Sequence, residues 1–186
     1  DWSSDVCSSD LAYSTAQLLF SVGGFEIRPV QSTDIKNKFT FDQYFTSRML
    51  NCIIMLICMI GYIVVNGYTG VEALTVFWIL GYRMVEAVAD VYSGLFQQRE
   101  RIDISGKEML MRSGISTITF TIILWLTDNL LYAAMTLTLT SLVIMLFYDL
   151  HMKKYFEPTP VHLEWRGILG IYNACWPLFV SSFIMN

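Results

Sequence analysis

Three charged residues interrupt a stretch of the sequence that is otherwise free of charge. Arg83, Glu86 and Asp90 are the charged residues between positions 73 and 98. Their spacing of i, i+3 and i+7 predicts that all three lie on one face of a helix. An arginine on such a face can bind a phosphate or carboxylate group of a substrate, and a neighbouring acid can balance the arginine between substrates. Glu86 or Asp90 could also bind a coupling ion, H⁺ or Na⁺.

The apolar surroundings limit where this charged face can point. A charge near the centre of a bilayer costs about 2.5–3.5 kcal/mol or more, so the face must meet other helices or a water-filled cavity. Two interpretations stay open. The three residues form a polar path for a substrate, or an Arg83–Glu86 pair only ties helices together.

Arg28 and Pro177 are two further candidates. Arg28 follows a Gly-Gly pair and precedes Pro29, so it is expected where a membrane span ends near the inner face. It could bind an anionic head group, or extend to lipid phosphate as many interfacial arginines do. Pro177 lies within the last apolar run, where it removes one helical hydrogen bond and predicts a hinge or a static bend.

The composition predicts the elements that carry these residues. Of the 186 residues, 54% are hydrophobic and only 15% are charged, with a formal net charge of −4. This balance excludes a disordered, nucleic-acid-binding or ordinary soluble protein. Residues 49–71, 129–148 and 167–186 carry no charge, and each run is close to the ~20 residues that cross a bilayer as a helix.

The sequence therefore predicts an all-α polytopic membrane protein with about six transmembrane helices. Uncharged runs of 20 or more make buried helices of a large soluble protein a poor alternative. The predicted spans are roughly 12–25, 49–66, 73–97, 110–127, 129–149 and 167–186, which together form one transmembrane helical bundle over 12–186.

The positions of Lys and Arg test this layout independently of hydropathy. Eleven of the twelve basic residues fall in alternate connections, and the connections around 66–72 and 127–129 have none. Cytoplasmic loops carry such an excess of Lys and Arg. The basic connections are therefore expected on the cytoplasmic side, with residues 97–112 as a helix or loop at the inner membrane surface and without a catalytic role.

Both ends of the chain carry separate expectations. Residues 1–11, DWSSDVCSSDL, resemble the translated read-through of a sequencing-library adaptor and are expected to be non-biological. Because the sequence also stops within an apolar run, we expect it to be a fragment of a larger protein.

The remaining residue types predict neither catalysis nor a metal. Cys52, Cys58 and Cys175 lie in apolar runs without the paired spacing of a zinc site, and His151 and His162 flank an inner loop. We expect no catalytic residues, no metal site and no cofactor. Hydroxyl residues are frequent in 113–121 and 136–141, and their expected role is hydrogen bonding between neighbouring helices.

Several motifs, in this order, resemble those of the polysaccharide flippases of the multidrug/oligosaccharidyl-lipid/polysaccharide exporter superfamily. These proteins carry O-antigen, capsule and exopolysaccharide repeat units. The motifs are a span ending in GGFEIR (23–28), a helix running into YSGLFQQRER (92–101), a hydroxyl-rich helix pair, and a last helix with LG at 169–170 and WPLF at 176–179. The resemblance covers nearly all of residues 12–186.

This resemblance implies a specific fold and substrate. The fragment would correspond to helices two through seven of a transporter of twelve or fourteen helices in two bundles. Such a transporter moves an undecaprenyl-diphosphate-linked oligosaccharide across the bacterial cytoplasmic membrane by alternating access. Basic residues that line the family's cavity would correspond to Arg83 and, more weakly, to Arg28. This sequence departs from the family in having one deep basic residue beside two acids.

Two other functions stay open. A multidrug or cation antiporter of the same superfamily would use Glu86 and Asp90 for a cation, although Arg83 disfavours a cationic substrate. An integral-membrane glycan polymerase or acyltransferase usually has a large outer loop or an intramembrane histidine, and this sequence has neither. The partners expected in every case are membrane lipids and not nucleic acid.

Overall fold

The computed structural model describes residues 25–34, 36–154 and 165–185 of the chain. The 1–11 segment, almost all of the predicted span 12–25, the Gly-Gly pair before Arg28 and His162 lie outside these residues. The predictions made for them therefore stay predictions.

The described residues form helices and connections, with no β-strand among them. The helices are α2 (Ile27–Thr33), α3 (Phe41–Val65), α4 (Gly70–Gln98), α5 (Ile102–Thr127), α6 (Leu130–Ile144), the π-helix η1 (Met145–Asp149), α7 (Leu150–Lys153) and α8 (Trp165–Met185). Helices α3, α4 and α5 begin before the predicted spans 49–66, 73–97 and 110–127, because their first turns include polar residues that the search for uncharged runs left out. The all-α prediction is confirmed.

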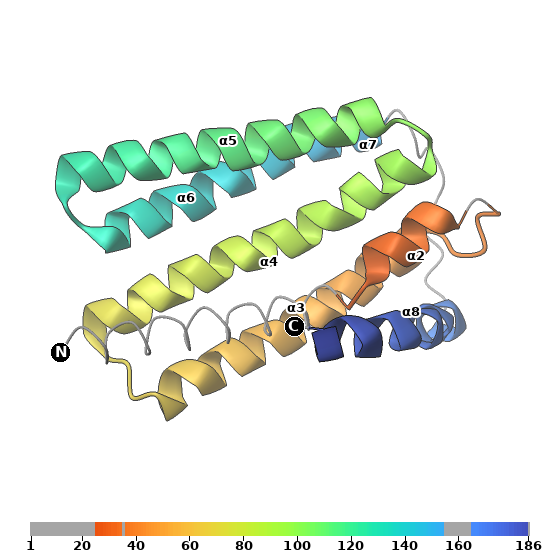
Figure 1. Cartoon of the computed structure of the whole chain (residues 1–186), viewed down its shortest axis with the longest axis horizontal. Helices are drawn as coiled ribbons and strands as arrows, with labels where there is room; N and C mark the ends of the chain where they lie inside the picture. Colours follow the sequence, from red (N-terminus) through yellow and green to blue (C-terminus); the bar gives the residue numbers. More distant parts are fainter. Residues whose placement is uncertain (1–24, 35, 155–164, 186) are drawn as a thin grey trace.

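Helix α4 occupies the centre of the arrangement. It packs against α5, α6 and η1 on one side and against α2 and α3 on the other. Helix α8 contacts α2 and α3, so α2, α3 and α8 form a second group of helices (Figure 1). Asp90 of α4 is thus within reach of side chains on both α2 and α3.

Among the described residues, three helical segments are long and apolar enough to cross a membrane. They are Phe41–Val65, Ile102–Thr127 and Leu130–Met152, the last of which runs from α6 through η1 into α7. Large apolar side chains such as Ile57, Leu110 and Trp125 are exposed on these segments, as expected for surfaces that face lipid. The chain is thus an all-α polytopic membrane protein, as the sequence predicts.

Helices α4 and α8 are also long, with 29 and 21 residues. An α-helix of 29 residues extends about 43 Å, which exceeds the thickness of a hydrocarbon core. Their predicted spans, 73–97 and 167–186, stay predictions.

Short turns reverse the chain between the long helices. Gly67 in the turn between α3 and α4 and Gly70 at the start of α4 have φ angles of 68° and 59°, a conformation that glycine adopts without steric cost. Between α5 and α6, Asp128 has a φ of 47° and the side chain of Asn129 accepts a hydrogen bond from the backbone N–H of Leu131. These N-cap and turn residues make each pair of joined helices, α3 with α4 and α5 with α6, run antiparallel.

The end of the bundle opposite to these two turns contains the start of α3, residues 99–101 between α4 and α5, and α7 (Figure 1). We call it the basic end, because nearly all described Lys and Arg residues lie there. They are Arg28, Lys36, Lys38, Arg48, Arg99, Arg101, Lys107, Arg112, Lys154 and Arg166.

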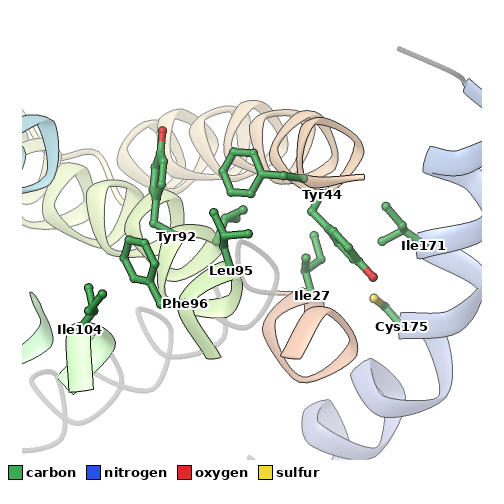
Figure 2. Close-up of a cluster of buried hydrophobic side chains, with 10 residues drawn as sticks. Ile27, Tyr44, Tyr92, Leu95, Phe96, Ile104, Ile171 and Cys175 are labelled. Atoms are coloured by element: carbon green, nitrogen blue, oxygen red, sulfur yellow. The ribbon is translucent and has the colours of Figure 1, made fainter. Parts of the chain in front are cut away.

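The buried apolar core lies near the same end. Figure 2 shows Ile27 of α2, Tyr44 of α3, Leu95 of α4 and Cys175 of α8 converging there. The core also includes Phe41, Val91, Tyr92, Phe96, Ile104 and Ile171. The elements that carry charged side chains at the basic end are thus held by a shared core, which fixes the positions of those side chains.

Helix α2 approaches α4 closely at a glycine. A Cβ atom added to Gly94 would lie 2.5 Å from Oε1 of Gln31, whose side chain is fully buried. Glycine therefore permits the contact that brings Arg28, on the same short helix, against α4.

Candidate functional site

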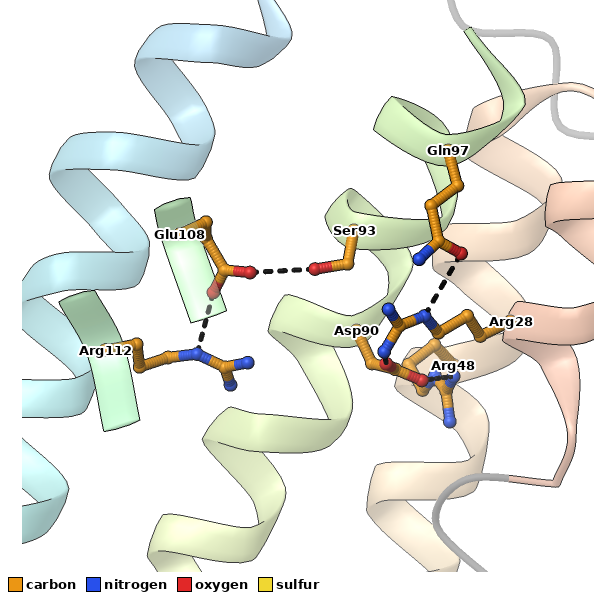
Figure 3. Close-up of polar contacts among 7 residues, drawn as sticks. All are labelled: Arg28, Arg48, Asp90, Ser93, Gln97, Glu108 and Arg112. Atoms are coloured by element: carbon orange, nitrogen blue, oxygen red, sulfur yellow. Dashed lines mark hydrogen bonds and ion pairs between the residues drawn. The ribbon is translucent and has the colours of Figure 1, made fainter. Parts of the chain in front are cut away.

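Two groups of charged side chains flank α4 at the basic end (Figure 3). The Asp90 cluster consists of Arg28, Arg48, Asp90 and Gln97 and joins α2, α3 and α4. The Glu108 cluster consists of Ser93, Glu108, Arg112 and Asp149 and joins α4, α5 and η1.

In the Asp90 cluster, one carboxylate pairs with two guanidinium groups. Nη1 of Arg28 lies 2.8 Å from Oδ1 of Asp90, and Nη2 of Arg48 lies 3.1 Å from Oδ2. Nε of Arg28 also donates to Oε1 of Gln97 at 3.4 Å. With both arginines charged, the two guanidinium groups and one carboxylate carry a formal net charge of +1 inside the helical bundle.

The two arginines differ in their access to the surroundings. The side chain of Arg48 is 0% exposed, whereas those of Arg28 and Asp90 are 31% and 25% exposed. A buried arginine needs its carboxylate, because an uncompensated charge in the interior is costly. Arg48 therefore holds Asp90 in place, and Arg28 is the member that a ligand can reach.

The connection between α2 and α3 explains how Arg28 is positioned. The carboxylate of Asp34 accepts hydrogen bonds from the backbone N–H groups of Lys38 and Phe39, at 2.9 and 3.0 Å, and from the hydroxyl of Tyr44 at 3.1 Å. The side chain of Gln98 donates to the backbone carbonyl of Asp34 at 2.7 Å. These bonds hold the end of α2 between α3 and the end of α4.

The start of α3 is fixed by a capping box. The side chain of Thr40 accepts from the backbone N–H of Gln43, and the side chain of Gln43 accepts from the backbone N–H of Thr40. Farther along α3, the hydroxyl of Tyr172 on α8 donates to the carbonyl of Ser47 at 3.0 Å and to Oδ1 of Asn51 at 2.8 Å. The helix that carries Arg48 is thus anchored on both sides of that residue.

In the Glu108 cluster, two acidic side chains lie near a single guanidinium group. Glu108 accepts a hydrogen bond from the hydroxyl of Ser93 at 2.7 Å, and its other oxygen lies 2.7 Å from Nε of Arg112. Asp149 is close enough to Glu108 and Arg112 to interact with both electrostatically. Glu108 and Asp149 are fully buried and Arg112 is nearly so.

The structure divides the predicted trio on α4 into two parts. Nη1 of Arg83 lies 2.8 Å from Oε2 of Glu86, and the hydroxyl of Tyr82 donates to Oε1 of Glu86 at 3.4 Å. Asp90 instead pairs with Arg28 and Arg48. The sequence thus located the charged residues on one helix, but it did not reveal which of them contact each other.

Four charged residues of the two clusters were not among the predicted site residues. The sequence predicts Arg48 in the connection before the span 49–66, yet it lies within α3. Glu108 and Arg112 were placed in an inner-surface segment at 97–112, yet they are buried in α5. Their i, i+4 spacing was the one available signal. Asp149 ends the predicted span 129–149, and no feature of the sequence pairs it with α5.

The hinge candidate Pro177 lies inside α8, which continues as helix from Trp165 to Met185. Cys58 is exposed on α3, whereas Cys52 and Cys175 are buried, and the three are free thiols. Within residues 25–34, 36–154 and 165–185, no group of three or more His, Cys, Asp or Glu side chains is placed to hold a metal ion.

Comparisons with known proteins return no relative. No protein-family model and no curated protein matches the sequence, and no solved structure matches the fold.

Proposed function

We propose that this protein is a carrier that exports lipid-linked oligosaccharide repeat units across the bacterial cytoplasmic membrane by alternating access. The observation that carries the proposal is the Asp90 cluster, in which two arginines share one carboxylate inside an all-α membrane protein. The motif resemblance to polysaccharide flippases supports the same function.

The chemistry of the Asp90 cluster suits an anionic head group. A diphosphate presents several oxygens to which a guanidinium group can donate two parallel hydrogen bonds. Arg28 is partly exposed and already has a carboxylate partner, so a phosphate can replace Asp90 as the acceptor. Arg48 then remains paired with Asp90, and the buried charges stay balanced.

The surface of the bundle suits the lipid part of such a substrate. Exposed apolar side chains cover α3, α5 and α6, so a polyprenyl chain can stay in the bilayer while its head group meets Arg28 of the Asp90 cluster. A multidrug or cation antiporter fits this site less well, because two arginines surround Asp90 and repel a cation.

The test replaces Arg28 in the gene of the source organism and measures exported polysaccharide together with lipid-linked repeat units retained inside the cell. We expect Arg28→Ala to reduce export about tenfold or more, since a hydrogen bond to a charged group contributes about 1.5–3 kcal/mol. Arg28→Lys should retain part of the export, because it keeps the charge but loses the paired donors.

Arg101→Ala is the matched control. Arg101 is an exposed arginine at the same end that pairs with Asp103 at 2.9 Å, and its loss should leave export unchanged. Equal export by the Arg28→Ala and Arg101→Ala variants, at equal protein levels, would reject the proposal. Altered resistance to cationic drugs with normal polysaccharide would instead identify a drug antiporter.

A further inference from the structure

Asp149 is a buried carboxyl group without a hydrogen-bond partner. Its side chain is 0% exposed, and neither Oδ1 nor Oδ2 is hydrogen-bonded in the structure. It is the last residue of η1, the π-helical segment between α6 and α7. Single π-helical turns of this kind occur frequently at functional sites. A buried ionised carboxylate that lacks a partner is costly, and such groups become neutral instead.

Several titratable groups from the neighbouring helices face Asp149. Glu108 and Arg112 of α5 interact with it electrostatically, as does Tyr92 of α4. Tyr148 precedes it on the same π-helix, while α6 is free of charged residues and His151 of α7 is exposed.

The charges in this cluster do not balance when every group is ionised. Two carboxylates, Glu108 and Asp149, face the single guanidinium group of Arg112, which leaves a formal charge of −1. Arg112 pairs with Glu108 through Nε, and Ser93 donates to the other oxygen of Glu108. Glu108 is therefore stabilised as an anion by its two partners. The carboxylate of Asp149 is the one left without a balancing positive charge, and a bound proton would supply that charge.

We propose that Asp149 is a proton-binding site that Glu108 and Arg112 complete. In the occupied state, one proton from water is bound to a carboxylate oxygen of Asp149, and Arg112 remains paired with Glu108. Release of the proton to water leaves a carboxylate, and no other covalent bond forms or breaks. Nη1 of Arg112 has no hydrogen-bond partner, so the guanidinium group can then turn towards Asp149. Proton exchange would thus change the contacts between α5 and η1.

A proton fits the cluster better than a metal cation does. Hard cations such as Ca²⁺ and Mg²⁺ take about six or more oxygen ligands, whereas no group of three or more His, Cys, Asp or Glu side chains in the described parts of the chain is placed to hold a metal ion. The fixed positive charge of Arg112 also repels a second cation. The proposal does not depend on transport, so it can fail or hold separately from the proposed flippase function.

The test is infrared spectroscopy of the purified full chain in lipid nanodiscs, with ¹³C-labelled aspartate. At neutral pH we expect the C=O stretching band of a protonated aspartic acid, and we expect this band to disappear at alkaline pH. The band should be lost in Asp149→Asn and retained in Asp103→Asn, since Asp103 is half-exposed and paired with Arg101. A wild-type spectrum without the band, or an unchanged band in Asp149→Asn, would overturn the proposal.

Thermal unfolding supplies a second measurement on the same samples. Asparagine has the shape of a protonated aspartic acid, so the two proteins should unfold at similar temperatures at low pH. As the pH rises, the wild type should lose thermal stability relative to Asp149→Asn, because only the wild type must bury an ionised carboxylate. Parallel curves across the pH range would contradict the proposal. The wild-type band and its pH titration are measured without any variant, so a wild-type spectrum without the band overturns the proposal even where Asp149→Asn folds poorly.

Discussion

Arg48 is completely buried against Asp90, a residue 42 positions farther along the chain. Its Nη2 atom lies 3.1 Å from Oδ2 of that carboxylate, and Arg28 occupies the other carboxylate oxygen. One acidic residue of the central helix α4 thus joins α2 and α3. This relationship makes Asp90 a structural residue as well as a candidate site residue, and the two roles can be separated by experiment.

Replacing Asp90 should destabilise the fold more than replacing Arg28. Asp90→Asn removes the carboxylate that lies 3.1 Å from the buried guanidinium group of Arg48, and breaking a buried pair in this way costs about 3–5 kcal/mol. Arg28 is partly exposed, so Arg28→Ala should cost about 1 kcal/mol or less. The loss of stability in each variant is measured by unfolding the detergent-solubilised protein and monitoring tryptophan fluorescence.

Asp103→Asn provides the control for this comparison, because its partner Arg101 lies outside the core. We expect its unfolding to match that of the wild type. If Asp90→Asn unfolds at the same temperature as Asp103→Asn, Arg48 does not depend on Asp90.

The helical fold could be predicted from the sequence because local features determine it. Long uncharged runs require helices in a membrane, and the turns at 66–69 and 128–129 follow from glycine, aspartate and asparagine. The helix starts could not be predicted in the same way. A search for uncharged runs stops at Arg48, whereas α3 begins at Phe41, because tertiary contacts with Asp90 and α8 allow a charged residue inside the bundle.

The candidate site was predictable only in part, for the same physical reason. The i, i+3 and i+7 spacing places Arg83, Glu86 and Asp90 along one helix, but it does not say what packs on each turn. Helices α2 and α3 reach Asp90, whereas Glu86 pairs with its own helix. The buried Asp149 has its charged neighbours on α5, about 40 positions earlier in the chain, and helical periodicity carries no information about contacts at that distance.

The two ends of the bundle should face opposite sides of the membrane. Asn66 lies in the turn between α3 and α4, and Lys38 lies at the basic end; both are exposed. Because basic connections remain in the cytoplasm, a membrane-impermeant maleimide should label Asn66→Cys in intact cells and Lys38→Cys only after permeabilisation. The native cysteines are replaced by serine first. Labelling of Lys38→Cys in intact cells would contradict this orientation.

A hydroxyl group should contribute measurably to the contact between α4 and α6. Oγ1 of Thr138 donates to the backbone carbonyl of Trp78 at 2.7 Å. This is the interhelical bond predicted for such hydroxyls, whereas Thr121 and Thr136 donate to carbonyls of their own helices. Such interhelical bonds contribute about 0.6 kcal/mol on average in membrane proteins and up to about 1.7. Thr138→Val should therefore lower the unfolding free energy by about 1 kcal/mol.

Thr136→Val is the matched control, since Thr136 is partly exposed and its hydroxyl donates to a carbonyl of its own helix, that of Tyr132. It should change the unfolding free energy by less than about 0.5 kcal/mol. Equal losses in the two variants would show that the bond to Trp78 contributes nothing.

The pair formed by Arg83 and Glu86 distinguishes a substrate path from a structural tie. The two side chains lie 2.8 Å apart and are 31% and 25% exposed, so both remain accessible to a ligand. If Arg83 binds the anionic substrate, Arg83→Ala should abolish polysaccharide export while immunoblotting shows similar protein levels.

Exchanging the two residues, Arg83→Glu with Glu86→Arg, restores the ion pair but places its positive charge one helical turn away. Export should therefore stay low in the exchanged protein, because a substrate site requires the charge at a defined position. Normal export by Arg83→Ala, or full recovery on exchange, would show that the pair only holds the helix in place.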